Sequence, residues 1–143
     1  MIPNFNDIGN LPAGMHQATW EEFYERFGYT PHRRKLLDGL ELAMRQLRDV
    51  GCTRIWVDGS FVTAKERPGD YDACWLEDGV GIPFLRAKYP VLLNYEDMRM
   101  AQKEKYYGEL FMSKTGDGFM TFLDFFQQDD RTSIKKGIIQ LEL

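Results

Sequence analysis

The segment from Thr30 to Gly51 carries the strongest secondary-structure signal in this sequence. Thr30-Pro31 places a capping hydroxyl directly before a proline at the first helical position. Apolar side chains then recur at helical spacing, at Leu36, Leu37, Leu40, Ala43, Met44 and Leu47. The pattern predicts an amphipathic helix that ends at Val50-Gly51 and packs one face on a core.

Shorter signals precede this helix. Residues 1–18 contain two prolines and two glycines among Asn and Asp, and predict an extended arm laid over the domain. Thr19-Trp20-Glu21-Glu22 has the form of a capping box, with a hydroxyl at the N-cap and a glutamate three residues later. It predicts a helix of about two turns that ends at Gly28.

Strand and helix signals alternate in the rest of the chain. A short helix is expected around Phe84–Lys88, and Tyr95–Tyr107 predicts a polar-faced helix that ends at Gly108. Strands are predicted at Arg54–Asp58, Asp70–Leu76, Phe119–Phe126 and Gly137–Leu143. We expect a single α+β domain over residues 1–143, with a small mixed or antiparallel sheet of about four strands backed by helices.

Charge and cysteine content exclude several classes of protein. A net charge of -4 disfavours general DNA or RNA binding, which needs a basic surface. Cys52 and Cys74 lack CxxC spacing, so neither a disulfide framework nor a zinc site is expected. The sequence has no apolar run of about 18 residues and no signal-peptide pattern, which predicts a cytoplasmic protein without membrane contact.

Asp70-Tyr71-Asp72 places two carboxylates at alternate positions of a predicted strand, so both side chains leave the same face. Adjacent carboxylates repel each other, and a divalent cation that prefers oxygen ligands, Mg²⁺ or Mn²⁺, would offset this repulsion. The alternative is a solvated turn, because Pro68-Gly69-Asp70 is also favourable turn chemistry.

Asp124 is the single charged residue in the apolar segment Phe122–Phe126. A solitary buried charge is unfavourable without compensation, and neighbouring strands lie about 4.8 Å apart. Asp124 therefore is a candidate third carboxylate, which would bind a second metal and accept the proton of an incoming hydroxyl. The alternative is a strand-end aspartate that faces solvent or pairs with a lysine.

Gly59-Ser60 follows a predicted strand and offers a close backbone approach, a hydroxyl and exposed N–H groups for phosphate oxygens. Lys65 and Arg67, between this pair and Asp70, are candidates to neutralise the β- and γ-phosphates, and Lys103 is a similar candidate. Gly-Ser also ends many strands without any binding role, and solvated segments explain these basic residues equally well.

The basic run His32-Arg33-Arg34-Lys35 occupies the first turn of the long helix. Positive charge there opposes the helix macrodipole and needs an offsetting reason. Binding of an acidic partner or RNA would explain the positive charge. The favoured explanation is a solvated face neutralised by Asp38 and Glu41.

The run Val57-Asp58-Gly59-Ser60, followed after nine residues by Asp70-Tyr71-Asp72-Ala73, resembles the signature of the DNA polymerase β-type nucleotidyltransferase superfamily. That signature continues with a carboxylate on a later strand, the part predicted for Asp124. The string DGSFVTAKERPGDYDACW, with QKEKYYGELF and FLDFFQQD, is also similar to small uncharacterised bacterial proteins (DUF6932-like), regarded as minimal members of the superfamily. Asp58 departs from the pattern, which usually has an apolar or aromatic residue there.

The resemblance implies a nucleotidyltransferase-like fold and metal-dependent transfer of a nucleoside monophosphate from a nucleotide triphosphate. ATP is the expected substrate, Mg²⁺ or Mn²⁺ the expected metal, and a protein or RNA the expected acceptor. Relatives often act in toxin–antitoxin or defence settings, which implies a cognate partner protein. The alternative is a non-catalytic module that keeps the fold and binds such a partner, as an antitoxin would.

Overall fold

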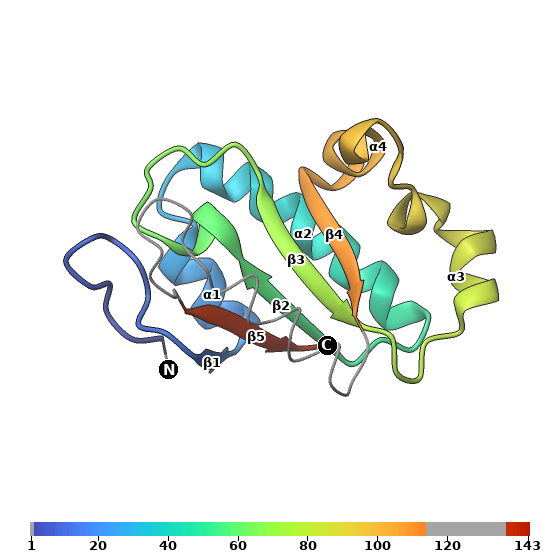
Figure 1. Cartoon of the computed structure of the whole chain (residues 1–143), viewed down its shortest axis with the longest axis horizontal. Helices are drawn as coiled ribbons and strands as arrows, with labels where there is room; N and C mark the ends of the chain where they lie inside the picture. The colour runs from blue at the N-terminus through green and yellow to red at the C-terminus, as the bar shows by residue number, and fades with distance from the viewer. Residues whose placement is uncertain (1, 114–136) are drawn as a thin grey trace.

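The computed structural model describes residues 2–113 and 137–143, which form a mixed five-stranded sheet with helices packed on it (Figure 1). The strands are β1 (Met15–Ala18), β2 (Arg54–Asp58), β3 (Tyr71–Leu76), β4 (Gly108–Ser113) and β5 (Ile138–Glu142). The helices are α1 (Trp20–Phe27), α2 (Pro31–Asp49), α3 (Ile82–Lys88) and α4 (Glu96–Tyr106), with short 3-10 helices at Gly59–Val62 and Pro90–Leu93.

Both amino-terminal helices begin and end where the sequence predicts. The Thr19 hydroxyl accepts from the Glu22 N–H, and the Glu22 carboxylate accepts from the Thr19 N–H, which completes the capping box. The Thr30 hydroxyl accepts from the Arg33 N–H at the start of α2. These side chains satisfy N–H groups that lack partners inside the helix, which is why the two starts are readable from local sequence.

The sheet has the order β1-β5-β2-β3-β4. β2 is antiparallel to β5 and β3, whereas β1 runs parallel to β5 and β4 runs parallel to β3. Alternate residues therefore face opposite sides, and α2 runs behind the strands (Figure 1). The helix-covered side holds the main core with Val57, Ala73 and Trp75, while Trp56, Cys74, Leu76 and Ile138 form a separate apolar cluster on the other side.

Three features differ from the sequence-based expectation. Residues 15–18 of the predicted arm form the edge strand β1, and residues 108–113 form β4, where no strand was predicted. The described sheet thus has five strands instead of about four, so the coarse α+β prediction is confirmed and its strand count is wrong. Left-handed backbone at Asp97, Met98 and Arg99 also interrupts the predicted helix Tyr95–Tyr107. The predicted strand Phe119–Phe126 lies outside the described residues.

No helix in the described ranges, 2–113 and 137–143, combines the length and the apolar character that crossing a membrane requires.

Gln102 joins α4 to β4. Its side chain is 0% exposed, donates to the Leu92 carbonyl at 3.1 Å and accepts from the Leu110 N–H at 2.9 Å. We expect Gln102→Leu to lower the free energy of unfolding by about 2 kcal/mol, because two buried backbone groups lose their partner. Chemical denaturation measures the change. Glu104→Gln, on the exposed face of α4, is the control and should stay within about 0.5 kcal/mol; equal values for both variants would contradict this role.

Candidate functional site

Carboxylates occupy one edge of the sheet, where β2 ends and where β3 and β4 begin. In the strand register, Asp58 lies opposite Asp72, and Asp72 lies opposite Glu109. Directly paired residues in neighbouring strands project from the same face. Asp58, Asp72 and Glu109 therefore form a row across β2, β3 and β4, on the side of the sheet away from α2.

The two halves of the sequence motif meet at this edge. Gly59 follows β2 with a positive φ of 79°, and a Cβ added to it would lie 2.5 Å from Asp72 Oδ2. The Asp72 carboxylate thus packs against the backbone of Gly59, and any larger residue there would displace it. Ser60 is partly exposed beside it, and its carbonyl accepts from the Thr63 hydroxyl at 2.6 Å.

Asp70 lies beside the same edge, half-buried and among charged side chains. Burial raises the pKa of the Asp70 carboxyl, and the negative charge of Glu109 raises it further. The ammonium groups of Lys103 and Lys65 lower this pKa and so offset part of the increase. Lys103 Nζ also pairs with Glu109 Oε1 at 3.1 Å. Acidic and basic side chains therefore both lie near Asp70.

A cavity of about 200 Å³ opens next to Asp70, between the first turns of α2 and the end of α4. Its basic lining residues are His32, Lys35 and Lys103, and Leu36, Gly69 and Tyr107 complete the wall with Asp70. His32 Nε2 donates to the Pro68 carbonyl at 2.5 Å and thereby ties the start of α2 to the turn before β3. The lining therefore combines basic side chains with the Asp70 carboxylate.

The predicted site residues thus fall into three groups. Gly59, Asp70 and Asp72 lie at one edge of the sheet, with Ser60 beside Gly59 and with Lys65 and Lys103 around Asp70. Arg67 lies exposed in the segment between the two halves of the motif. Asp124 lies outside the described residues.

Glu109 is a residue of the candidate site that the sequence pattern does not predict. It follows Gly108, which the helix pattern marks only as a stop signal, and the strand Gly108–Ser113 is short. The signal for this strand is the alternation in burial at residues 109–111, because the buried Leu110 separates the partly exposed Glu109 and Phe111.

In the basic run at the start of α2, Arg34 and Lys35 are exposed, as the favoured prediction of a solvated face expects, but Arg33 is not. Arg33 is fully buried, and its guanidinium donates to backbone carbonyls. Arg34 Nε donates to the Gly28 carbonyl at 2.7 Å. Side-chain hydrogen bonds to the neighbouring backbone offset the unfavourable helix macrodipole in place of Asp38 and Glu41.

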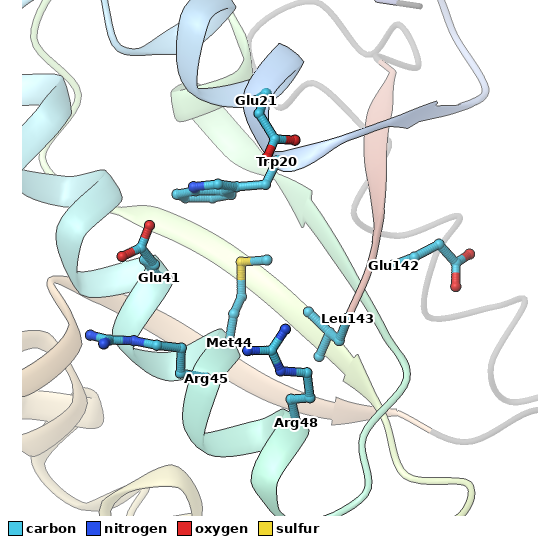
Figure 2. A pocket seen from close by; sticks show the side chains of 8 residues that line it. All are labelled: Trp20, Glu21, Glu41, Met44, Arg45, Arg48, Glu142 and Leu143. Carbon is cyan, nitrogen blue, oxygen red and sulfur yellow. The ribbon is translucent and has the colours of Figure 1, made fainter.

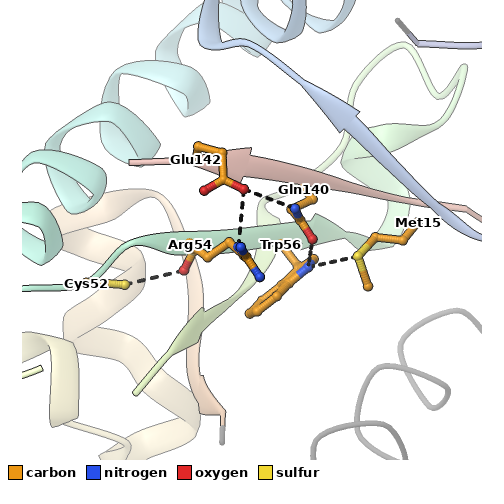
Figure 3. Close-up of polar contacts among 6 residues, drawn as sticks. All are labelled: Met15, Cys52, Arg54, Trp56, Gln140 and Glu142. Carbon is orange, nitrogen blue, oxygen red and sulfur yellow. Dashed lines mark hydrogen bonds and ion pairs between the residues drawn. The ribbon is translucent and has the colours of Figure 1, made fainter. Parts of the chain in front are cut away.

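Two other polar regions contain none of the predicted site residues. Figure 2 shows a cavity of about 290 Å³ bordered by α1, the second half of α2 and the end of β5, with Trp20, Met44, Arg45 and Arg48 in its lining. Figure 3 shows the Trp56 indole N–H donating to Gln140 Oε1 at 3.0 Å and reaching Met15 Sδ at 3.2 Å, which links β2, β5 and β1.

Comparison with known proteins gives a family without a known activity. A family model described as a family of unknown function, DUF6932, matches residues 3–142. This chain belongs to the DUF6932 family. No curated protein and no solved structure matches it. For this DUF6932 protein, the relation to the nucleotidyltransferase superfamily therefore remains a prediction, which depends on its own motif and geometry.

Proposed function

We propose that this chain is a metal-dependent nucleotidyltransferase that moves a nucleoside monophosphate from a nucleotide triphosphate, with ATP as the expected substrate. One observation carries the proposal. Gly59 lies against the Asp72 carboxylate, although the two residues belong to different halves of the motif. A phosphate-binding pair and a metal-binding carboxylate would have to be neighbours in this way for both to act on one triphosphate.

The residues at this edge have the donor chemistry of a magnesium site. The described ranges contain no group of three or more His, Cys, Asp or Glu residues placed to hold a metal ion. Mg²⁺, however, usually keeps several waters and binds through one or two carboxylates together with substrate phosphates. Asp70 and Asp72 would supply those carboxylates to Mg²⁺ or Mn²⁺, which would arrive with the nucleotide and stabilise negative charge in the transition state.

The other residues would position the substrates. Gly59 permits close approach of the triphosphate, Ser60 offers its hydroxyl, and Lys65 and Lys103 offset phosphate charge beside Asp70. The acceptor hydroxyl would attack the α-phosphorus in line, pyrophosphate would leave, and a third carboxylate would take the hydroxyl proton. Asp124 is the sequence candidate for that role, and Glu109 is the structural one because its register position adjoins Asp72.

The proposal also covers the class of acceptor and the biological setting of the reaction. A protein or RNA acceptor, a cognate partner in a toxin–antitoxin or defence system, and a cytoplasmic location are expected from the family resemblance. Cys52 and Cys74, both buried free thiols, are compatible with a reducing compartment. A non-catalytic module with the same fold is the rival, and nucleotide binding separates the two.

Isothermal titration calorimetry with ATP tests the proposal. We expect binding in the presence of Mg²⁺ and little or none with excess EDTA, since the metal would join the carboxylates to the phosphates. Incubation with ATP labelled at the α-phosphate and a cell extract should then label an acceptor. Glu109→Gln should reduce labelling, whereas Glu142→Gln, on an exposed strand end of the same sheet, should not. Absence of Mg²⁺-dependent ATP binding would favour the non-catalytic module.

A further inference from the structure

Arg33 is the largest charged side chain in the interior of the described structure, with 0% of its surface exposed. A guanidinium has five N–H donors, and that of Arg33 forms five hydrogen bonds to backbone carbonyls. The acceptors are Phe27 at 3.2 Å, Phe61 at 2.8 Å, Thr63 at 3.0 Å and Lys65 at 3.2 and 2.5 Å. The donor capacity of the side chain is therefore fully used.

Most of these acceptors lie in one segment. Phe61, Thr63 and Lys65 are alternate residues directly after Gly59-Ser60, in the connection that leads to Asp70. The guanidinium also lies 4.6 Å from the centre of the Tyr29 ring and 4.8 Å from that of Phe61. Its position is thus set by aromatic contacts as well as by hydrogen bonds, which leaves the segment few alternative conformations.

Neighbouring side chains hold the same connection. The Tyr29 hydroxyl donates to the carbonyls of Ala64 at 3.4 Å and Lys65 at 3.2 Å. His32 donates to the Pro68 carbonyl at the far end of the connection. The start of α2 and the residues before it therefore fix residues 61–68 at several points, and Arg33 is the central one.

Burying a cation is expensive, so five hydrogen bonds and two aromatic contacts must offset a large desolvation cost. Burial accordingly lowers the pKa of the Arg33 guanidinium. An apolar side chain would avoid that cost but could not bind the carbonyls of Phe61, Thr63 and Lys65, which lie at the end of the 3-10 helix Gly59–Val62 and in the segment directly after it. An arginine at this position therefore holds the backbone of residues 61–65 in one conformation, which an apolar side chain could not do.

We propose that Arg33 is a positioning residue, which sets Gly59-Ser60 and Lys65 for the phosphates of the nucleotide. This inference rests on the proposed function. Asp72 lies within β3, whose backbone pairs with β2 and β4, and Asp70 directly precedes that strand. Arg33 should therefore govern nucleotide affinity through the connection that carries Ser60 and Lys65.

Arg33→Lys tests this role, because an ammonium has only three donors and no planar fork. We expect the Kd of ATP with Mg²⁺ to rise about tenfold or more by calorimetry. Trypsin cleavage after Lys65 under native conditions should accelerate about tenfold as the connection opens. Cleavage after Lys105, an exposed residue of α4, should change less than about twofold. General destabilisation would instead accelerate cleavage after both lysines.

Two further variants complete the experiment. Arg34→Lys changes the adjacent arginine, which makes one hydrogen bond to Gly28, and should match the wild type in each measurement. Tyr29→Phe removes the one hydroxyl proton that the Ala64 and Lys65 carbonyls share. It should shift cleavage and nucleotide affinity in the direction of Arg33→Lys by a smaller factor. It keeps the inference testable if Arg33→Lys does not fold.

Wild-type cleavage rates and nucleotide affinities in Arg33→Lys and Tyr29→Phe would overturn the positioning role. Faster cleavage with unchanged nucleotide affinity would overturn it as well, since the connection would then not set the phosphates. If the wild-type protein does not bind ATP, the proposed function fails and the nucleotide part of this inference fails with it. The cleavage measurement needs no nucleotide, so it still decides whether Arg33 holds residues 61–65.

Discussion

Asp72→Asn is expected to lower nucleotidyl transfer at least about a thousandfold while the protein keeps its fold. The amide has the size of the carboxylate, so the close contact with Gly59 can remain. What it lacks is the negative charge that would hold a divalent cation against the triphosphate. Incorporation of label from α-labelled ATP measures the loss.

Asp72→Asn should lower the activity without lowering the thermal stability. Asp72 lies between Asp58 and Glu109 in the strand register, and like charges at opposed positions destabilise a sheet. Removing one charge should therefore leave Tm unchanged or raise it. Asp38→Asn, on an exposed position of α2, serves as the control for both measurements. Labelling by Asp72→Asn at the wild-type rate would exclude the proposed site, and a large drop in Tm would assign Asp72 a structural role.

Gly39→Ala should have the largest effect on stability. Gly39 lies in the middle of α2 where the end of α4 crosses it, and an added Cβ would lie 1.9 Å from the Tyr106 carbonyl oxygen. It would also lie 2.8 Å from Tyr107 Cδ2. Backbone atoms cannot rotate away as a side chain can, so the two helices must separate.

We expect Gly39→Ala to lower the free energy of unfolding by about 3 to 5 kcal/mol and Tm by roughly 10 °C or more. The helix propensity of alanine offsets only about 1 kcal/mol of this. Gly69→Ala is the matched control, because a Cβ there meets no atom within 4 Å. Thermal melting by circular dichroism distinguishes the two. Similar melting temperatures would mean that α4 is not packed against α2 in this way.

A displaced α4 should also impair the candidate site. Lys103 lies in the last turns of α4, and Tyr107 connects that helix directly to β4, which carries Glu109. Any Gly39→Ala protein that still folds should consequently show weaker nucleotide binding than the wild type. The long helix thus supports the site from two places, through Gly39 at α4 and through Arg33 at residues 61–65.

The sequence alone determined the elements whose signals are local. The caps at Thr19 and Thr30 each act on an N–H group three residues away, and the apolar period of α2 repeats within one helix. The strands β2 and β3 were likewise predictable, together with the spacing of Gly59-Ser60 and Asp70. These signals predict where each element begins, because the interacting groups are close along the chain.

Only the tertiary structure decided which elements become neighbours. β1 and β4 have weak patterns of their own and are strands because β5 and β3 offer them hydrogen-bonding edges. That pairing brings Glu109 beside Asp72, and the approach of α2 to residues 61–65 buries Arg33, which the sequence favoured as solvated. Both outcomes depend on contacts between residues more than 25 positions apart, which local propensity and charge pattern do not encode.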